Sequence, residues 1–284
     1  LAGQLQLNPM LFAALAFFLT GLGFKISLVP FHFWTADVYE GAPTSVAAYL
    51  SVISKGAAVF VLITLLFTVF EPLFAAWEIL IYLMAVLTIT IGNLFALRQQ
   101  NMQRFLAFSS VAQAGFILLG VIAGTQYGMS TVIYFLLVYI FSNLGAFGVA
   151  AIVYNSSGKI NIDDYRGFYQ TNPKLSLVML LSLFSLAGIP PVAGFFGKFF
   201  LFAAAAEKGY YWLVLIAVAN TIISLYYYLR VVRAMFLDRS EEPIGRIHSD
   251  VLTRLSLAIS VAGIVLAGVF SQVFNWIHSV SWGM

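Results

Sequence analysis

The stretch GLGFKISLVPFHFWTADVYEGAPT, residues 21–44, decides how this chain can fold. It places Lys25 and Pro30 inside an apolar segment, Met10 to Val38, that exceeds the roughly 20 residues needed to cross a bilayer. A proline inside a helix removes one backbone donor and clashes with the preceding turn. Irregular backbone at membrane depth is tolerated only where it is buried in protein or lines a wet cavity. The stretch therefore predicts a membrane helix that is broken at Pro30 beside a lysine.

The composition of the whole chain agrees with a membrane protein. Of the 284 residues, 62% are hydrophobic and 9% are charged, whereas a soluble domain carries about 25% charged residues. The mean hydropathy of +0.96 leads to the same conclusion. The absence of cysteine excludes disulfides, iron–sulfur clusters and thiolate metal sites in this sequence. The chain begins at Leu1 rather than Met, and we expect it to be part of a longer polypeptide.

Apolar segments of spanning length recur along the chain, and each is too long and too uniformly apolar for a barrel strand. We predict an all-α polytopic membrane protein of about eight transmembrane helices. The segments run over residues 10–38, 46–70, 79–97, 102–124, 129–154, 175–206, 210–236 and 251–277.

The basic residues of the connecting loops indicate which way the chain is inserted. Ten of the 14 Lys and Arg residues lie in loops or at segment ends on one side, Lys208 alone lies on the other, and the remaining three lie well inside segments. Because basic loops stay in the cytoplasm, both ends of this chain are expected on the outer side of the membrane. The dispersed basic residues and the net charge of +3 do not indicate nucleic-acid binding.

Three lysines, Lys25, Lys55 and Lys198, lie inside spanning segments, and each would cost about 2.5–3.5 kcal/mol at mid-membrane if it faced lipid. Lys198 follows a second predicted break at Pro190 and Pro191. A buried amine releases its proton more easily than an exposed one, so a proton relay is one interpretation of these lysines. The alternative is that their side chains extend to the membrane surface.

Other polar residues allow more than one role. His32, just past Pro30, titrates near neutral pH, but it could equally bond the carbonyls that the break frees. Asp37 and Glu40 precede a helix restart at Pro43, where capping and solvation compete with a role in proton uptake. The run Tyr226–Arg230 near a cytoplasmic helix end is interpreted as an interfacial anchor. No spacing of metal ligands, phosphate loop or redox motif is present in the sequence.

Residues 21–44 closely resemble the signature of the antiporter-like membrane subunits of respiratory complex I. The likeness extends through Ser54-Lys55, Gly92-Asn93-Leu94 and Ser109-Ser110-Val111. It continues through residues 185–198, SLAGIPPVAGFFGK, and residues 225–230, LYYYLR, which are most similar to the bacterial subunit N branch of that family.

The resemblance implies a fourteen-helix fold of two inverted repeats, each with one broken helix, of which this chain is similar to helices seven to fourteen. It implies that residues 1–70 end the first repeat, residues 71–240 form the second, and residues 241–284 form the C-terminal transmembrane helix. In such subunits the position of Lys25 belongs to a first half-channel, that of Lys55 links two half-channels, and that of Lys198 releases protons outward. His32 matches the histidine that follows the first break.

Two departures from the family pattern limit this relay. The glutamate that such subunits pair with the first lysine belongs to an earlier helix, so we expect that this chain alone does not pump. Gln113 stands where many relatives carry histidine, and an amide can position a water but cannot hold the proton's charge. Gln113 and Ser110 are therefore expected to act as relay or water-positioning groups.

The resemblance implies a proton-translocating subunit of a redox-driven NADH:quinone oxidoreductase in the bacterial inner (cytoplasmic) membrane, with no redox centre or metal in this chain. Flavin mononucleotide, iron–sulfur clusters and quinone would belong to other subunits. The expected partners are other membrane subunits of the complex, the lipid bilayer, protons and water, and no nucleic acid. Two alternatives stay open: a subunit of a multi-subunit cation/proton antiporter, and a membrane scaffold whose lysines only bind headgroups or water.

Overall fold

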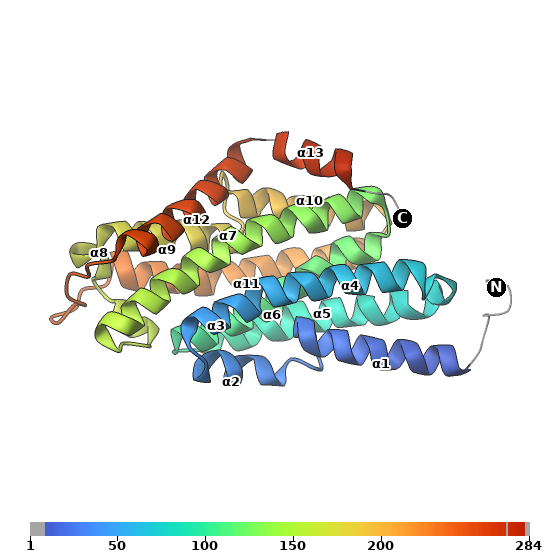
Figure 1. Ribbon diagram of the computed structural model, residues 1–284, viewed down its shortest axis with the longest axis horizontal. Helices are drawn as coiled ribbons and strands as arrows, with labels where there is room; N and C mark the ends of the chain where they lie inside the picture. Colours follow the sequence, from blue (N-terminus) through green and yellow to red (C-terminus); the bar gives the residue numbers. More distant parts are fainter. Residues whose placement is uncertain (1–8, 271, 282–284) are drawn as a thin grey trace.

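A computed structural model describes residues 9–270 and 272–281 of the chain, and these residues form an elongated bundle of helices (Figure 1). The predicted all-α membrane fold is confirmed: seven helices in the described part are long and apolar enough to cross a membrane. Within the described residues the only β-type pairing is an isolated bridge between Asn101 and Asn161. The helices are α1 (Pro9–Ile26), α2 (Phe33–Gly41), α3 (Thr44–Tyr49), α4 (Lys55–Thr68), α5 (Phe74–Arg98), α6 (Met102–Ala123), α7 (Gln126–Ser157), α8 (Phe168–Thr171), α9 (Pro173–Ala187), α10 (Ala193–Glu207), α11 (Tyr211–Phe236), α12 (Val251–Val269) and α13 (Gln272–Val280).

Most of the basic residues lie in connections and adjoining helix ends that gather at one end of the bundle. The α5–α6, α7–α9 and α11–α12 connections all lie at the left end in Figure 1, whereas α1 and α7 begin and α13 finishes at the right end. We call these the basic end and the opposite end. The charge asymmetry expected along the sequence is therefore an asymmetry between the two ends of the structure.

Helix α6 is the central helix of the bundle, and it is buried along its membrane-spanning length. It packs against α2, α5, α7, α10 and α11. An asparagine begins it in the expected way, because the Asn101 side chain accepts hydrogen bonds from the backbone N–H groups of Gln103 and Arg104 at 2.8 and 3.2 Å. The polar side chains of α6 thus lie in the protein interior rather than against lipid.

The first predicted break is present between α1 and α2, at residues 27–32. Ser27 adopts a left-handed conformation with φ of 69°, and the bond before Pro30 is cis. The break leaves backbone donors without helical partners, and α5 supplies one acceptor: the Val29 N–H donates to the Thr88 hydroxyl at 3.0 Å. The two half-helices are therefore held by the neighbouring spanning helix.

The second predicted break separates α9 from α10 at residues 188–192. Gly188, whose φ of 84° suits glycine, caps the end of α9, and the N–H groups of Gly188 and Ile189 both donate to the Phe184 carbonyl at 3.0 Å. The last carbonyls of α9, those of Leu186 and Ala187, accept instead from side chains of other helices. This break is consequently a place where backbone acceptors face side-chain donors inside the bundle.

The last apolar segment, predicted over residues 251–277, is divided in the structure. Helix α12 ends at Val269, and α13 continues toward the opposite end at a different angle (Figure 1). Neither proline nor an obvious turn motif marks this site, so the sequence did not indicate it. The Ala267 carbonyl near the division accepts a hydrogen bond from the buried Tyr134 hydroxyl of α7 at 2.7 Å. A side chain from another helix thus satisfies the backbone here as well.

Gly194 allows the two halves of the second broken helix to touch, and we expect Gly194→Ala to destabilise the protein severely. A Cβ at this position would lie 1.7 Å from the Ser185 carbonyl oxygen, which is backbone and cannot rotate away. Overpacking of this kind costs about 1–3 kcal/mol and sometimes more. Gly21→Ala is the matched control, because no atom lies within 4 Å of a Cβ there. Thermal unfolding in detergent should separate the two variants, and equal melting temperatures would contradict the close approach.

Candidate proton-relay site

Lys55 is buried inside the bundle and is held by α6. Its side chain is 1% exposed, and its Nζ donates to the Ser110 carbonyl at 2.9 Å and to the Ser110 hydroxyl at 3.0 Å. A short π-helical turn, Leu50–Ser54, precedes Lys55 and widens the helix just before it. Ser110, predicted as a relay or water-positioning residue, is thus the direct partner of Lys55.

Lys198 is buried at the second break, on the first turns of α10. Its Nζ donates to the Ala187 carbonyl at 3.1 Å and lies 4.7 Å from the centroid of the Phe116 ring. The negative end of the α9 dipole and the aromatic face both favour a cation at this position. No carboxylate pairs with Lys55 or Lys198 among the described residues. Each amine therefore depends on backbone, hydroxyl and ring partners, and not on a fixed negative charge.

Gln113 lies between these lysines, one turn along α6 from Ser110. Its amide Nε2 donates to the Leu186 carbonyl at 3.0 Å and to the Tyr228 hydroxyl at 3.1 Å. That hydroxyl also bonds the Ser109 hydroxyl at 2.5 Å. The Gln113 Oε1 is buried and finds no partner among the described residues. Two polar groups thus lie one turn apart on α6: Ser110 contacts Lys55, and Gln113 contacts the Leu186 carbonyl, whose neighbour Ala187 accepts from Lys198.

The interpretation of Tyr226–Arg230 as an interfacial anchor is wrong for its buried members. Tyr227 and Tyr228 are fully buried, whereas Tyr226 is 66% exposed. Tyr227 donates to Asn93 Oδ1 at 2.8 Å, and Arg230 donates to the Leu97 carbonyl at 3.0 Å and to the Gln99 carbonyl. Hydropathy alone could not distinguish these tyrosines, because a phenol suits both a membrane surface and a buried hydrogen bond.

A second polar group beside Lys55 was also missed in the sequence. The Ser51 hydroxyl bonds the Tyr139 hydroxyl at 2.9 Å and accepts from the Asn143 amide, which also donates to Tyr139 at 3.0 Å. The buried Tyr39 hydroxyl interacts with Ser51 and Ser110 without a hydrogen bond of regular geometry. These side chains come from α2, α7 and the π-helical turn, and only the fold brings them together.

The first break does not bring its two predicted residues together. Lys25 is exposed on the α1 surface and forms no hydrogen bond or ion pair with any described residue. His32 is buried against Phe33 and Phe95, with ring centroids 4.5 and 6.3 Å away, and neither ring nitrogen has a partner in the described part. The His32 ring interacts with the freed Pro30 carbonyl without a hydrogen bond of regular geometry, and the role of Lys25 stays a prediction.

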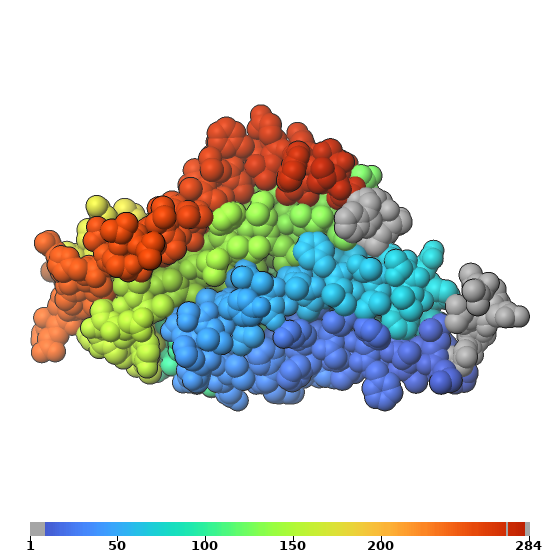
Figure 2. Space-filling view, viewed as in Figure 1, coloured from blue at the N-terminus to red at the C-terminus, as the bar shows by residue number. Residues whose placement is uncertain are grey.

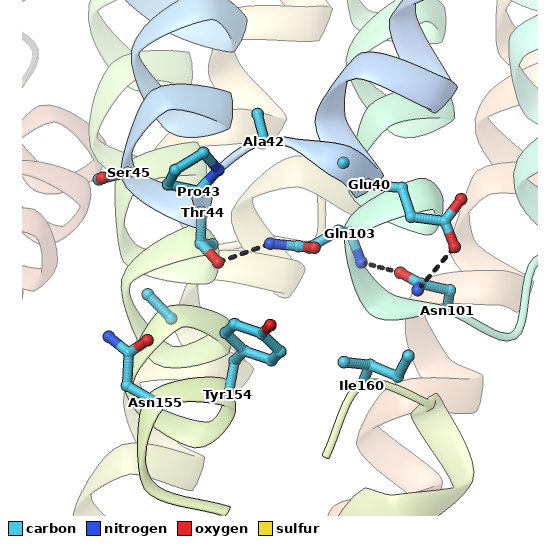
Figure 3. A pocket seen from close by; sticks show the side chains of 12 residues that line it. Glu40, Ala42, Pro43, Thr44, Ser45, Asn101, Gln103, Tyr154, Asn155 and Ile160 are labelled. Carbon is cyan, nitrogen blue, oxygen red and sulfur yellow. Dashed lines mark hydrogen bonds between the residues drawn. The ribbon is translucent and has the colours of Figure 1, made fainter. Parts of the chain in front are cut away.

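A cavity of about 500 Å³ opens at the basic end, between the α2–α3 corner, the start of α6 and the end of α7 (Figure 3). Glu40 and Thr44 line it, and the Thr44 hydroxyl accepts from Gln103 Nε2 at 2.5 Å. Arg104 joins both acidic residues of this corner, with Asp37 at 2.7 Å and Glu40 at 2.6 Å. The two carboxylates thus hold α2 against the start of α6, and Glu40 also faces the cavity.

Comparison with known proteins relates the chain to membrane subunits. A profile of the transmembrane family described as NADH:quinone oxidoreductase/Mrp antiporter matches residues 2–224. The chain is 56% identical over 269 residues to NADH-quinone oxidoreductase subunit N of Phocaeicola vulgatus, covering 94% of this chain and 57% of that protein. It is 49% identical over 229 residues to NAD(P)H-quinone oxidoreductase subunit 2 of a Picosynechococcus species, covering 81% of this chain and 44% of the relative.

Solved structures give the same relation. A chain of respiratory complex I from Thermus thermophilus with bound aureothin has 33% identity and a TM-score of 0.78, with 92% of this chain and 58% of that chain covered. A chain of the Mrp complex from a Dietzia species has a TM-score of 0.86 at 24% identity, covering 95% and 58%, and shares the fold. This chain spans 57%, 58% and 44% of the length of three curated relatives that it matches.

Proposed function

This chain belongs to the transmembrane NADH:quinone oxidoreductase/Mrp antiporter family, and on that premise we propose that it forms the second half of a proton path in a redox-driven NADH:quinone oxidoreductase. The observation that carries the proposal is the pair of buried amines, Lys55 and Lys198, on either side of α6. Ser110 accepts a hydrogen bond from Lys55. Gln113 donates to the Leu186 carbonyl, which is next to the Ala187 carbonyl that accepts from Lys198. Protons move between the lysines through hydroxyls and water along α6.

The cavity at the basic end supplies this path with protons from the cytoplasm. Thr44 lines the cavity and begins α3, and Ser51 lies two helical turns further on the same chain segment, four residues before Lys55. Glu40 is the acidic side chain that lines this cavity, where it pairs with Arg104. Release occurs beyond Lys198, toward the opposite end, where α10 finishes. Both ends of this chain then face the outer side.

Lys25 enters the path only in the full-length protein. Its exposed position on α1 supports the expectation that further helices cover it and supply the acidic partner. The electron carriers belong to other subunits, and this subunit contacts the other membrane subunits of the complex. Flavin and iron–sulfur subunits that copurify with the full-length protein would agree with this function. Their absence, together with sodium-dependent proton exchange in vesicles, would instead favour a cation/proton antiporter.

The Tyr228 hydroxyl is the bridge that compensates for an amide at position 113, and we expect Tyr228→Phe to lower proton pumping about tenfold. The substitution removes only the oxygen that joins Ser109 to Gln113, whereas Gln113 keeps its bond to the Leu186 carbonyl. Loss of a positioned proton-transfer group lowers a reaction rate about 10²–10⁴-fold. A smaller effect is expected here because water can replace part of this bridge. The measurement is NADH-driven acidification of vesicles that contain the purified complex.

Tyr226→Phe is the matched control, because that side chain faces outward on the same helix. A Gln113→His change added to Tyr228→Phe should restore part of the pumping, since an imidazole can hold the proton that the amide cannot. Equal pumping by the Tyr228 and Tyr226 variants would contradict a role for this hydroxyl.

A further inference from the structure

A second cavity, of about 470 Å³, lies at the basic end between the start of α9 and the start of α12. We call it the basic cavity, because Lys174, Arg246, His248 and Arg254 line it. No acidic side chain lines it among the described residues. The proton path described above uses none of these residues. The concentration of cationic groups at one hollow therefore needs a separate explanation.

The basic cavity is a built feature, since a buried asparagine fixes its wall. Asn172 is 5% exposed, and its Nδ2 donates to the Gly245 carbonyl at 2.9 Å while its Oδ1 accepts from the Ile247 N–H at 2.8 Å. Arg254 is anchored by its Nε, which donates to the Ser249 carbonyl at 2.8 Å. The terminal nitrogens of that guanidinium form no hydrogen bond or ion pair with other described residues.

The surrounding electrostatics favour an anion. Helices α9 and α12 both begin at this cavity, and the N-terminus of a helix carries a partial positive charge. The nearest carboxylate in the sequence, Asp250, caps α12 by accepting from the Thr253 N–H at 3.2 Å and from the Thr253 hydroxyl. These hydrogen bonds hold the pKa of the Asp250 carboxyl below its ordinary value. Asp250 is thus bound to the helix terminus and does not line the cavity.

An apolar surface continues from the basic cavity along α12. Val251, Leu255 and Val265 are 76%, 56% and 44% exposed, and their spacing places them on the side of the helix next to Arg254. Figure 2 shows α12 and the segment before it as a ridge on the surface of the molecule. A cationic hollow that adjoins an exposed apolar helix face matches the shape and polarity of one amphiphile. Soluble anions would use the hollow but not the apolar face.

We propose that the basic cavity binds the phosphate headgroup of an anionic phospholipid, whose acyl chains lie along the exposed face of α12. Basic pockets between transmembrane helices on the cytoplasmic side are suited to acidic headgroups. Arg254 and Arg246 contact the phosphate oxygens, because a guanidinium fork matches phosphate geometry. Lys174 adds charge at the α9 side. The lipid fixes the α11–α12 connection to the start of α9 and occupies a defined site rather than an average annular position.

The test uses the full-length protein in its purified membrane complex, incorporated into bilayer discs of phosphatidylcholine and phosphatidylglycerol. After mild delipidation, native mass spectrometry counts the retained phosphatidylglycerol for the wild-type protein and for the variant Lys174→Gln/Arg246→Gln/Arg254→Gln. One basic residue near the membrane surface changes lipid affinity about fivefold, so the triple variant should lose most of the retained lipid. Arg239→Gln is the matched control, an exposed basic residue that does not line the cavity.

Two further measurements distinguish a bound phospholipid from a soluble anion. Excess inorganic phosphate should leave the retained phosphatidylglycerol unchanged, because the acyl chains supply part of the binding. Displacement by inorganic phosphate would overturn the proposal and assign the cavity to a soluble anion. Equal lipid retention by the wild-type protein and the triple variant would also overturn it. Leu255→Ser on the apolar face should lower retention while leaving the basic residues in place, and no change there would contradict the acyl-chain position.

Discussion

Lys198→Met is expected to lower NADH-driven proton pumping about a hundredfold through this subunit while the complex still assembles. Methionine keeps the length and the apolar stem of the side chain but cannot bind a proton. Loss of a positioned acid–base group typically costs about 10²–10⁴ in rate. Replacement of a buried charged group by an apolar one of similar volume is often tolerated, because the burial penalty disappears with the charge. The Ala187 carbonyl loses its partner, which costs about 1–3 kcal/mol.

Lys208→Met is the control for this prediction. Lys208 follows the last residue of α10 and is exposed, so its replacement removes the same charge from the protein surface rather than from a buried site. Pumping should be measured in vesicles by a pH-sensitive dye, alongside NADH oxidation with a soluble electron acceptor that bypasses the membrane part. Assembly is checked by native gel electrophoresis. Equal pumping by the Lys198 and Lys208 variants would show that Lys198 is not part of the proton path.

The breaks were predictable because they depend on residue types with strong local effects. Pro30 and the Pro190-Pro191 pair each interrupt a segment that is otherwise apolar and long enough to span a membrane, and both interruptions are present. The division after Val269 was not predictable, because no proline or glycine turn requires it there. It depends on packing between α12, α7 and α10, and such contacts leave no local pattern.

The lysines were predictable as buried groups, but their partners were not. A charged residue in a spanning segment must avoid lipid, and this reasoning placed Lys55 and Lys198 correctly inside the bundle. The same reasoning placed Lys25 inside, yet it is exposed on the surface of α1. The sequence could not show that Ala187 or Ser110 would face an amine, because backbone carbonyls carry no residue-specific signal.

The tyrosines of α11 were predicted at the membrane surface, but two of the three are buried. Tyr226, Tyr227 and Tyr228 are consecutive, and a helix turns about 100° per residue, so three adjacent side chains cannot share one environment. Periodicity would have separated one exposed tyrosine from two that face inward, had the inward face of this helix been known. The fully buried α6 supplies that direction, since the Tyr228 hydroxyl reaches it at Ser109 and Gln113.

Replacement of Lys55 tests whether a buried charge or a transferable proton matters, and both Lys55→Met and Lys55→Arg are expected to lower pumping by about tenfold or more. Arginine keeps a positive charge and can still donate to the Ser110 carbonyl and hydroxyl, but it does not release its proton in proteins. A lysine that served only as a scaffold for water or headgroups would be replaced by arginine with little loss. A relay lysine would not.

The two Lys55 variants therefore give different results under the two explanations. Vesicle acidification and NADH oxidation should be compared for Lys55→Met, Lys55→Arg and Lys159→Met, the last being a loop lysine at the basic end that carries the same charge. Ser110→Ala adds a milder test, because it removes one of the two acceptors of Lys55 and leaves the carbonyl. Pumping at the wild-type level in the arginine variant would show that Lys55 acts through its charge alone. Loss in both variants, with intact assembly and intact pumping by the Lys159 variant, requires that the proton itself passes through this amine.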